Sequence, residues 1–148
     1  MNATAPVPLT ATTTLRLGAV GAVVSGRFTE RIGSLGLKPK DVTLLNLLQA
    51  GGPASQLEVA RTMGVAPSLV VTVADRLEAL GAVRRLRDQG DRRRQQLVLT
   101  DGGRELLARC TTLARELDEE LTAGLDAATR QALDAALGTL AAGLGLPN

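Results

Sequence analysis

The chain has 148 residues, of which 45% are hydrophobic and 22% are charged, a composition that can build one globular domain. It has no histidine, tyrosine or tryptophan and only one cysteine, so histidine-based nucleophiles, the common zinc sites and an intrachain disulfide are all excluded. We therefore expect no cofactor, no metal and no enzymatic activity. The formal net charge of +2 divides into an excess of six positive charges over residues 1–100 and of four negative charges over residues 101–148. A basic first part with an acidic end suggests an anion-binding module followed by a segment that avoids anions.

The N-terminal segment, residues 1–8, contains two prolines and is expected to be a disordered arm. It has neither the basic start nor the apolar run of a secretory signal, and no 18-residue apolar stretch follows. We therefore expect a cytoplasmic protein without a membrane segment. Residues 9–36 then carry apolar residues at mostly helical spacing, although three glycines weaken this predicted helix. Such a helix needs a packing partner.

Three shorter helices are predicted next, at residues 41–50, 56–63 and 67–80. Ser55 and Glu58 match a capping box and place the start of the middle one. Gly64 breaks that helix, and Pro67 suits the first turn of the next.

Two short strands, residues 83–86 and 96–100, are predicted to flank the turn DQGDRRR. Thr100 can cap a long helix over residues 101–121, and a final helix covers residues 127–142. The fold class is therefore mainly α with a small β-hairpin.

The stretch QLEVARTMGVAPSLVVTV, residues 56–73, has the pattern of two short helices that cross at a steep angle. Ala60 allows a close helix approach, and Gly64 allows a positive φ at the turn. A helix-turn-helix with Ser55 as its N-cap fits this pattern. The alternative is an ordinary helical hairpin in a core.

In a helix-turn-helix, the second helix would direct its N-terminal residues toward base edges. The candidate recognition residues here are Pro67, Ser68, Leu69, Val71 and Thr72. Arg76 lies one turn beyond Thr72 and could contact a phosphate. The alternatives for Arg76 are an ion pair with Asp75 or Glu78, or simple solvation.

The arginine-rich turn between the two predicted strands would form a wing. Gly90 supports a tight turn, and Asp88 or Asp91 can cap turn amides or hold an arginine side chain. Arginine side chains suit the negative potential of a narrow minor groove. Such a triplet alone is most simply a solvated surface, but its position directly after a helix-turn-helix pattern favours the wing. The candidate wing residues are Arg87, Asp91, Arg92, Arg93 and Arg94.

Two motifs, VAPSLVVTVADRLEALGAV at residues 65–83 and RDQGDRRRQQLVLTDGGRELL at residues 87–107, resemble the winged-helix core of the MarR family of bacterial transcription regulators. The resemblance implies a winged helix-turn-helix lobe over residues 37–104, flanked by dimerisation helices at residues 9–36 and 101–148. It also implies a homodimer whose helix at residues 67–80 enters the major groove while Arg93 and its neighbours enter the minor groove. Asp91 would orient those arginines.

The sequence departs from the family at Val71 and Thr72, where members often carry a hydroxyl residue followed by a basic one. The base-reading residues, and so the operator, are therefore left open. Cys110 lies on the apolar stripe of the long helix, which favours a packed cysteine over an oxidant sensor. Members of the family often bind small lipophilic or aromatic anions. Arg16 and Arg27 are candidate counter-charges here, or simply exposed helix arginines.

The sequence thus predicts a DNA-binding transcription regulator. It would be a repressor that binds a pseudo-palindromic operator on double-stranded DNA, and a small effector would release the repressor from that operator. One alternative is a winged-helix interaction module that has lost DNA or effector binding. The remaining class, an enzyme, would need a carboxylate pair or a serine–lysine dyad, and both lysines flank Pro39 in a turn.

Overall fold

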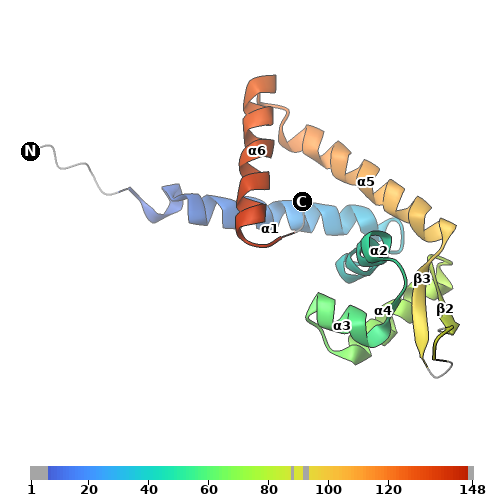
Figure 1. Ribbon diagram of the computed structural model, residues 1–148. Coiled ribbons are helices and arrows are strands. Elements are labelled where there is room, and N and C mark those ends of the chain that lie inside the picture. Colours follow the sequence, from blue (N-terminus) through green and yellow to red (C-terminus); the bar gives the residue numbers. More distant parts are fainter. Residues whose placement is uncertain (1–6, 88, 92–93, 147–148) are drawn as a thin grey trace, which may run out of the picture. The chain divides into compact units, whose positions relative to one another are not determined.

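The computed structural model describes residues 7–87, 89–91 and 94–146, and Figure 1 shows its helices and strands. A 3₁₀ turn at Leu9–Ala11 precedes the first helix. The α-helices are α1 (Thr13–Gly33), α2 (Pro39–Gly51), α3 (Gln56–Met63), α4 (Pro67–Ala79), α5 (Asp101–Leu121) and α6 (Ala127–Gly143). The strands are β1 (Ala54–Ser55), β2 (Val83–Arg87) and β3 (Gln95–Leu99). This mainly helical chain with a small sheet confirms the predicted fold class.

The chain divides into two compact units, residues 1–114 and 115–148. In the first unit, α2, α3, α4, the hairpin and the start of α5 surround one aliphatic core. Its fully buried side chains include Leu44, Leu45, Val59, Val70, Val73, Leu77 and Leu97. This core fixes α4 by its inner face and leaves the outer face to solvent.

The helix-turn-helix forms as the capping pattern predicts. The Ser55 side chain accepts a hydrogen bond from the Glu58 N–H at 3.2 Å, and the Glu58 carboxylate accepts one from the Ser55 N–H at 2.7 Å. These reciprocal bonds lower the pKa of Glu58, because they favour its charged form. Gly64 ends α3 with a φ of +63°, in the left-handed region that glycine adopts without strain. The predicted bounds of α3 are confirmed.

The sheet has three antiparallel strands in the order β1–β3–β2. Val83 pairs with Leu99 and Arg87 with Gln95, so β2 and β3 form the expected hairpin (Figure 1). The strand β1, which pairs Ala54 with Leu97, was not predicted. Two residues are too short for an alternating pattern to be visible.

The start of α5 packs very tightly against the turn between α4 and β2. Thr100 caps α5, because its Oγ1 accepts from the Gly103 N–H at 3.0 Å and donates to the Gly81 carbonyl at 2.5 Å. A Cβ on Gly103 would lie 2.2 Å from the Ala82 carbonyl oxygen and 2.5 Å from Leu99 Cδ1. Only glycine fits there, which gives a physical reason for the second glycine of LTDGG.

The bounds of α5 also match the prediction, those of α2, α4 and α6 differ from it by at most two residues, and α1 is shorter than predicted at both ends. α2 starts at Pro39, two residues early, because Pro39 occupies the first turn and the Lys38 N–H donates to Asp41 Oδ2 at 2.7 Å. The segment after residue 8 opens with a 3₁₀ turn, and α1 itself begins after Thr12, whose side chain caps it.

Both α1 and α6 expose large apolar side chains. In α1 these are Leu15, Leu17, Val20 and Val23, and only Ile32 is buried. Within the second unit, Asp126 caps α6 through the Thr129 N–H at 2.7 Å, and Arg130 pairs with Glu119 at 3.0 Å. No residue of α6 is buried, and Leu133, Leu137 and Leu140 are exposed. Surfaces of this kind are typical of association sites.

Candidate nucleic-acid interface

The outer face of α4 carries the candidate recognition residues. Pro67, Ser68, Leu69, Val71 and Thr72 are all exposed. The inner face places Val70, Val73, Ala74 and Leu77 in the core. The helix therefore offers one solvent-facing strip of two hydroxyls and three apolar side chains at its N-terminal end.

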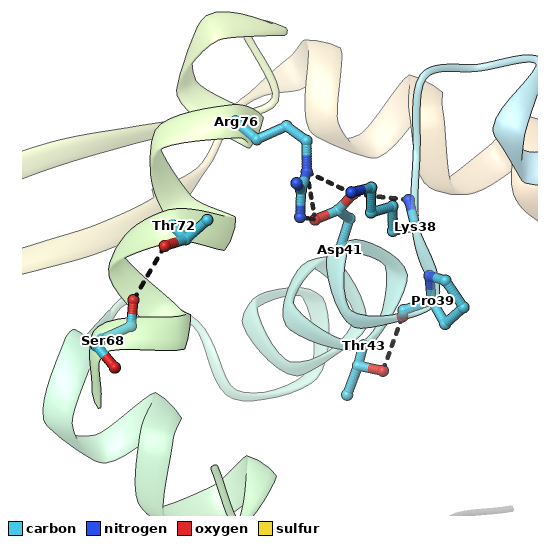
Figure 2. Close-up of polar contacts among 7 residues, drawn as sticks. All are labelled: Lys38, Pro39, Asp41, Thr43, Ser68, Thr72 and Arg76. Atoms are coloured by element: carbon cyan, nitrogen blue, oxygen red, sulfur yellow. Dashed lines mark hydrogen bonds and ion pairs between the residues drawn. The ribbon is translucent and has the colours of Figure 1, made fainter. Parts of the chain in front are cut away.

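The two hydroxyl residues of this strip are linked to each other through the backbone. Thr72 Oγ1 donates to the Ser68 carbonyl, one turn earlier, at 3.2 Å (Figure 2). This bond uses the only hydroxyl proton of Thr72, so its oxygen can still accept but not donate elsewhere. Ser68 keeps the more versatile hydroxyl.

Arg76 binds Asp41, a residue 35 positions away on α2. Its Nε lies 3.0 Å from Asp41 Oδ2 and its Nη2 lies 2.8 Å from Oδ1, the two-pronged geometry of a strong arginine–carboxylate pair. Figure 2 shows the side chain reaching across from α4 to α2. The Asp41 side chain is 0% exposed and that of Arg76 is 29% exposed. The predicted alternative of an ion pair with Asp75 or Glu78 is wrong, because another arginine holds both carboxylates.

That arginine is Arg85 on β2, which the sequence reasoning overlooked. Its Nη2 donates to Asp75 Oδ1 at 2.6 Å and to Gln56 Oε1 at 3.2 Å, and its Nη1 pairs with Glu78. Partial burial disfavours the charged guanidinium, but the two carboxylates outweigh this and raise the pKa of Arg85. Arg85 therefore ties the first strand of the hairpin to α4 and to the start of α3.

A cleft of about 560 Å³ opens beside the outer face of α4. Pro67 and Val71 line it from α4, Leu57, Glu58 and Arg61 from α3, and Arg94 and Gln95 from the hairpin. Arg61 was not singled out from the sequence, although its place on the first helix of the motif could have suggested it. The cleft thus joins the recognition strip to two guanidinium groups.

The candidate wing residues are only partly described. Asp88, Arg92 and Arg93 lie outside the described residues. Arg87 is exposed at the end of β2. Asp91 accepts from the Arg94 N–H at 2.9 Å through its carbonyl, and its carboxylate lies 3.7 Å from Arg94 Nε. Asp91 therefore orients one of the three arginines, through a loose ion pair.

Cys110 is packed in the core of the first unit. Burial raises the pKa of its thiol, and the nearby Arg109 only partly opposes this. A thiol that stays protonated and buried is a weak nucleophile, so the prediction of a packed cysteine is confirmed.

A second cleft of about 240 Å³ lies between the end of α1 and α5. It is lined by Ser34, Leu35, Arg109, Thr112 and Leu113. The predicted counter-charges Arg16 and Arg27 are exposed on α1 and line neither of these two clefts. Arg109, which was not predicted as a site residue, is the cation that lines the second cleft.

The parts of the chain that the structure describes contain no cluster of three or more cysteine, aspartate or glutamate side chains placed to hold a metal ion. No single helix there is long and apolar enough to cross a membrane; only α3 and α4 together reach that apolar length, and they bend by 112° at the turn.

Comparison with known proteins gives consistent matches. The MarR family model matches residues 35–94. The chain is 32% identical over 108 residues to the HTH-type transcriptional repressor Rv2887 of Mycobacterium tuberculosis, an alignment that covers 73% of this chain and 78% of that protein. It superposes on the transcriptional repressor CouR bound to a 23-mer DNA duplex with a TM-score of 0.70 and 34% identity, over 90% of this chain and 94% of CouR. The YusO protein of Bacillus subtilis gives a TM-score of 0.75 with 26% identity, over 86% of this chain and 91% of YusO.

Proposed function

The chain belongs to the MarR family, and we propose from this premise that it is a homodimeric repressor of a pseudo-palindromic DNA operator. Rv2887 and CouR are both named as transcriptional repressors, and CouR is seen on duplex DNA. Membership of this family makes the chain a DNA-binding transcription regulator. The roles of individual residues are our proposal.

One observation carries the proposal for the binding surface. The exposed N-terminal strip of α4 lies beside a cleft that also holds Arg61 and Arg94. A helix that enters the major groove needs base-reading side chains flanked by cations for the phosphates. We assign base contacts to Ser68, Leu69, Val71 and Thr72, with Pro67 at the start of the helix.

We assign the contacts to DNA phosphates to arginines of the hairpin and of α3. We assign Arg61 and Arg94 to phosphates, and we keep the wing assignment for Arg87, Arg92 and Arg93, with Arg93 directed to the minor groove. Asp91 supports Arg94. Arg76 is reassigned: because its Nε and Nη2 bind Asp41, it positions α4 against α2 instead of reaching a phosphate.

The exposed apolar faces of α1 and α6 support a homodimer. A second copy of the chain would cover the leucines and valines that these helices leave in solvent. Two copies related by a two-fold axis present two recognition helices, so the half-sites should lie about one helical turn, roughly 34 Å, apart.

The proposed effector is a small lipophilic or aromatic anion, as expected from the family. The second cleft supports Arg109 as its counter-charge in place of Arg16 and Arg27, because Arg109 lies among Leu35 and Leu113 at this opening. An aliphatic wall with one cation suits such a ligand.

The experiment is a selection from a random duplex library, followed by titrations of the selected operator at several salt concentrations. We expect an enriched two-fold sequence and a steep fall of affinity with salt. Arg94→Ala should weaken binding about tenfold for all duplexes and reduce the salt slope by about one. Arg115→Ala, which removes an exposed arginine of α5, is the charge-matched control and should do neither. If no sequence is enriched, the alternative of an interaction module without DNA binding replaces the proposal.

A further inference from the structure

The recognition strip of α4 lacks every side chain that reads a base by paired hydrogen bonds. Between Pro67 and Val73 the sequence has no arginine, lysine, asparagine, glutamine or acidic residue. The next two polar side chains, Asp75 and Arg76, are bound to Arg85 and Asp41. The bidentate contacts to guanine or adenine that usually give direct readout are therefore not available from this helix.

The two hydroxyl groups of the strip can discriminate only weakly between different bases. Thr72 donates its hydroxyl proton to the Ser68 carbonyl at 3.2 Å, and while this bond is kept its oxygen can only accept. Ser68 has one hydroxyl that donates or accepts equally well, and a single bond of this kind fits several bases.

The remaining exposed surface at this position is apolar. Leu69 is 38% exposed and Val71 is 39% exposed on α4, and Leu57 is 49% exposed at the start of α3. Leu57 and Val71 line the same cleft, which also holds Arg61 and Arg94. Apolar side chains that share a cleft with two guanidinium groups suit an apolar group displayed between two phosphate backbones, although Glu58 lines the same cleft.

The major groove offers one such group, the C5-methyl of thymine. We propose that this chain selects its operator by packing Val71 and Leu69 against thymine C5-methyl groups. The inference rests on the proposed function, since it names what the same surface reads. Because 5-methylcytosine carries a methyl at the same ring position, it should be read in the same way.

The first test replaces each thymine of the selected operator, one at a time, by deoxyuridine, which removes only the methyl group. At the contacted positions we expect affinity to fall about fourfold for each methyl, the effect of exposing one buried carbon. Positions outside the half-sites serve as controls and should not respond.

The second test is a double-mutant cycle between protein and DNA. Val71→Ala and Leu69→Ala should each make binding insensitive to loss of the methyl that the side chain contacts, so the two changes are not additive. Val71→Thr keeps the shape but adds a hydroxyl, and it should weaken binding to thymine. Circular dichroism checks that these surface variants remain folded.

The third test places 5-methylcytosine at a position where replacing a contacted thymine by cytosine has weakened binding. We expect methylation to recover part of the lost affinity. If deoxyuridine has no effect at any half-site position, or if the variants respond to it as the wild type does, methyl reading is overturned while the proposed function stands. A failed library selection would overturn both.

Discussion

The helices α4 and α6 have similar apolar content but very different surroundings. α4 buries Val70, Val73, Ala74 and Leu77 in the core of its unit, and two ion-pair systems hold its C-terminal half. α6 buries none of its residues, and its leucines are exposed. Helix α4 is positioned by its own chain, whereas α6 leaves its leucines uncovered in the single chain. This is the division expected when one part of a protomer reads DNA and another assembles the dimer.

The largest effect is expected from Leu77→Ala in α4. Because Leu77 is fully buried, the substitution leaves a cavity and should lower the free energy of unfolding by about 2–5 kcal/mol. Urea denaturation of variant and wild type at the same protein concentration measures the loss. A loss below about 0.5 kcal/mol would contradict the burial of α4.

Asp41→Ala should have the next largest effect. It removes the carboxylate partner of Arg76 and the acceptor of the Lys38 N–H, at a cost of about 2–3 kcal/mol, since one partner of a largely buried pair is left behind. The same denaturation assay applies. Replacing both partners, with Asp41→Leu and Arg76→Met, should restore much of the stability, because no charge is then left without its partner.

Arg85→Gln should weaken operator binding about tenfold without large unfolding, because it leaves Asp75 and Glu78 as uncompensated negative charges on the recognition helix. Fluorescence anisotropy on the selected operator measures this. Adding Asp75→Asn and Glu78→Gln to the variant should recover affinity. If it does not, Arg85 has another role.

Leu137→Ala makes in α6 the substitution that Leu77→Ala makes in α4. Since Leu137 is exposed in the single chain, we expect little change in the stability of the protomer but a three- to tenfold rise in the dimer dissociation constant, roughly as for an ordinary interface residue. Sedimentation at several concentrations gives the dissociation constant, and urea denaturation gives the stability. An unchanged dissociation constant would remove α6 from the interface.

Asp126→Asn should have the smallest effect, and only in acid. Hydrogen bonds from the backbone and side chain of Thr129 lower the pKa of Asp126 below its usual 3.8. A carboxylate with a lowered folded-state pKa stabilises the fold above the unfolded value and loses that contribution as the pH falls through the folded one. The wild type should therefore lose some α6 helicity, measured by circular dichroism, as the pH falls below the ordinary aspartate value of 3.8. The asparagine variant keeps a capping side chain that does not titrate, and its cap should not change there.

Local sequence signals predicted the elements well where each depended on neighbouring residues. The bounds of α3 follow from Ser55, Glu58 and Gly64, which act within one or two turns. The partners of Arg76 and Arg85 could not be predicted in this way. Asp41 is 35 residues from Arg76, and Gln56 is 29 residues from Arg85, so only the packed fold brings them together. The same holds for Arg61 and Arg94, which share a cleft although they belong to separate elements.

The close packing at Gly103 has a consequence for motion. The start of α5, the turn between α4 and β2, and the strand β3 meet there in close contact, and the hydrogen bonds of Thr100 link α5 to that turn. Because this contact leaves no room for a side chain, the first turn of α5 should move together with the turn after α4 and with β3. The winged helix-turn-helix lobe should therefore keep the geometry of this joint when it moves, without local unfolding.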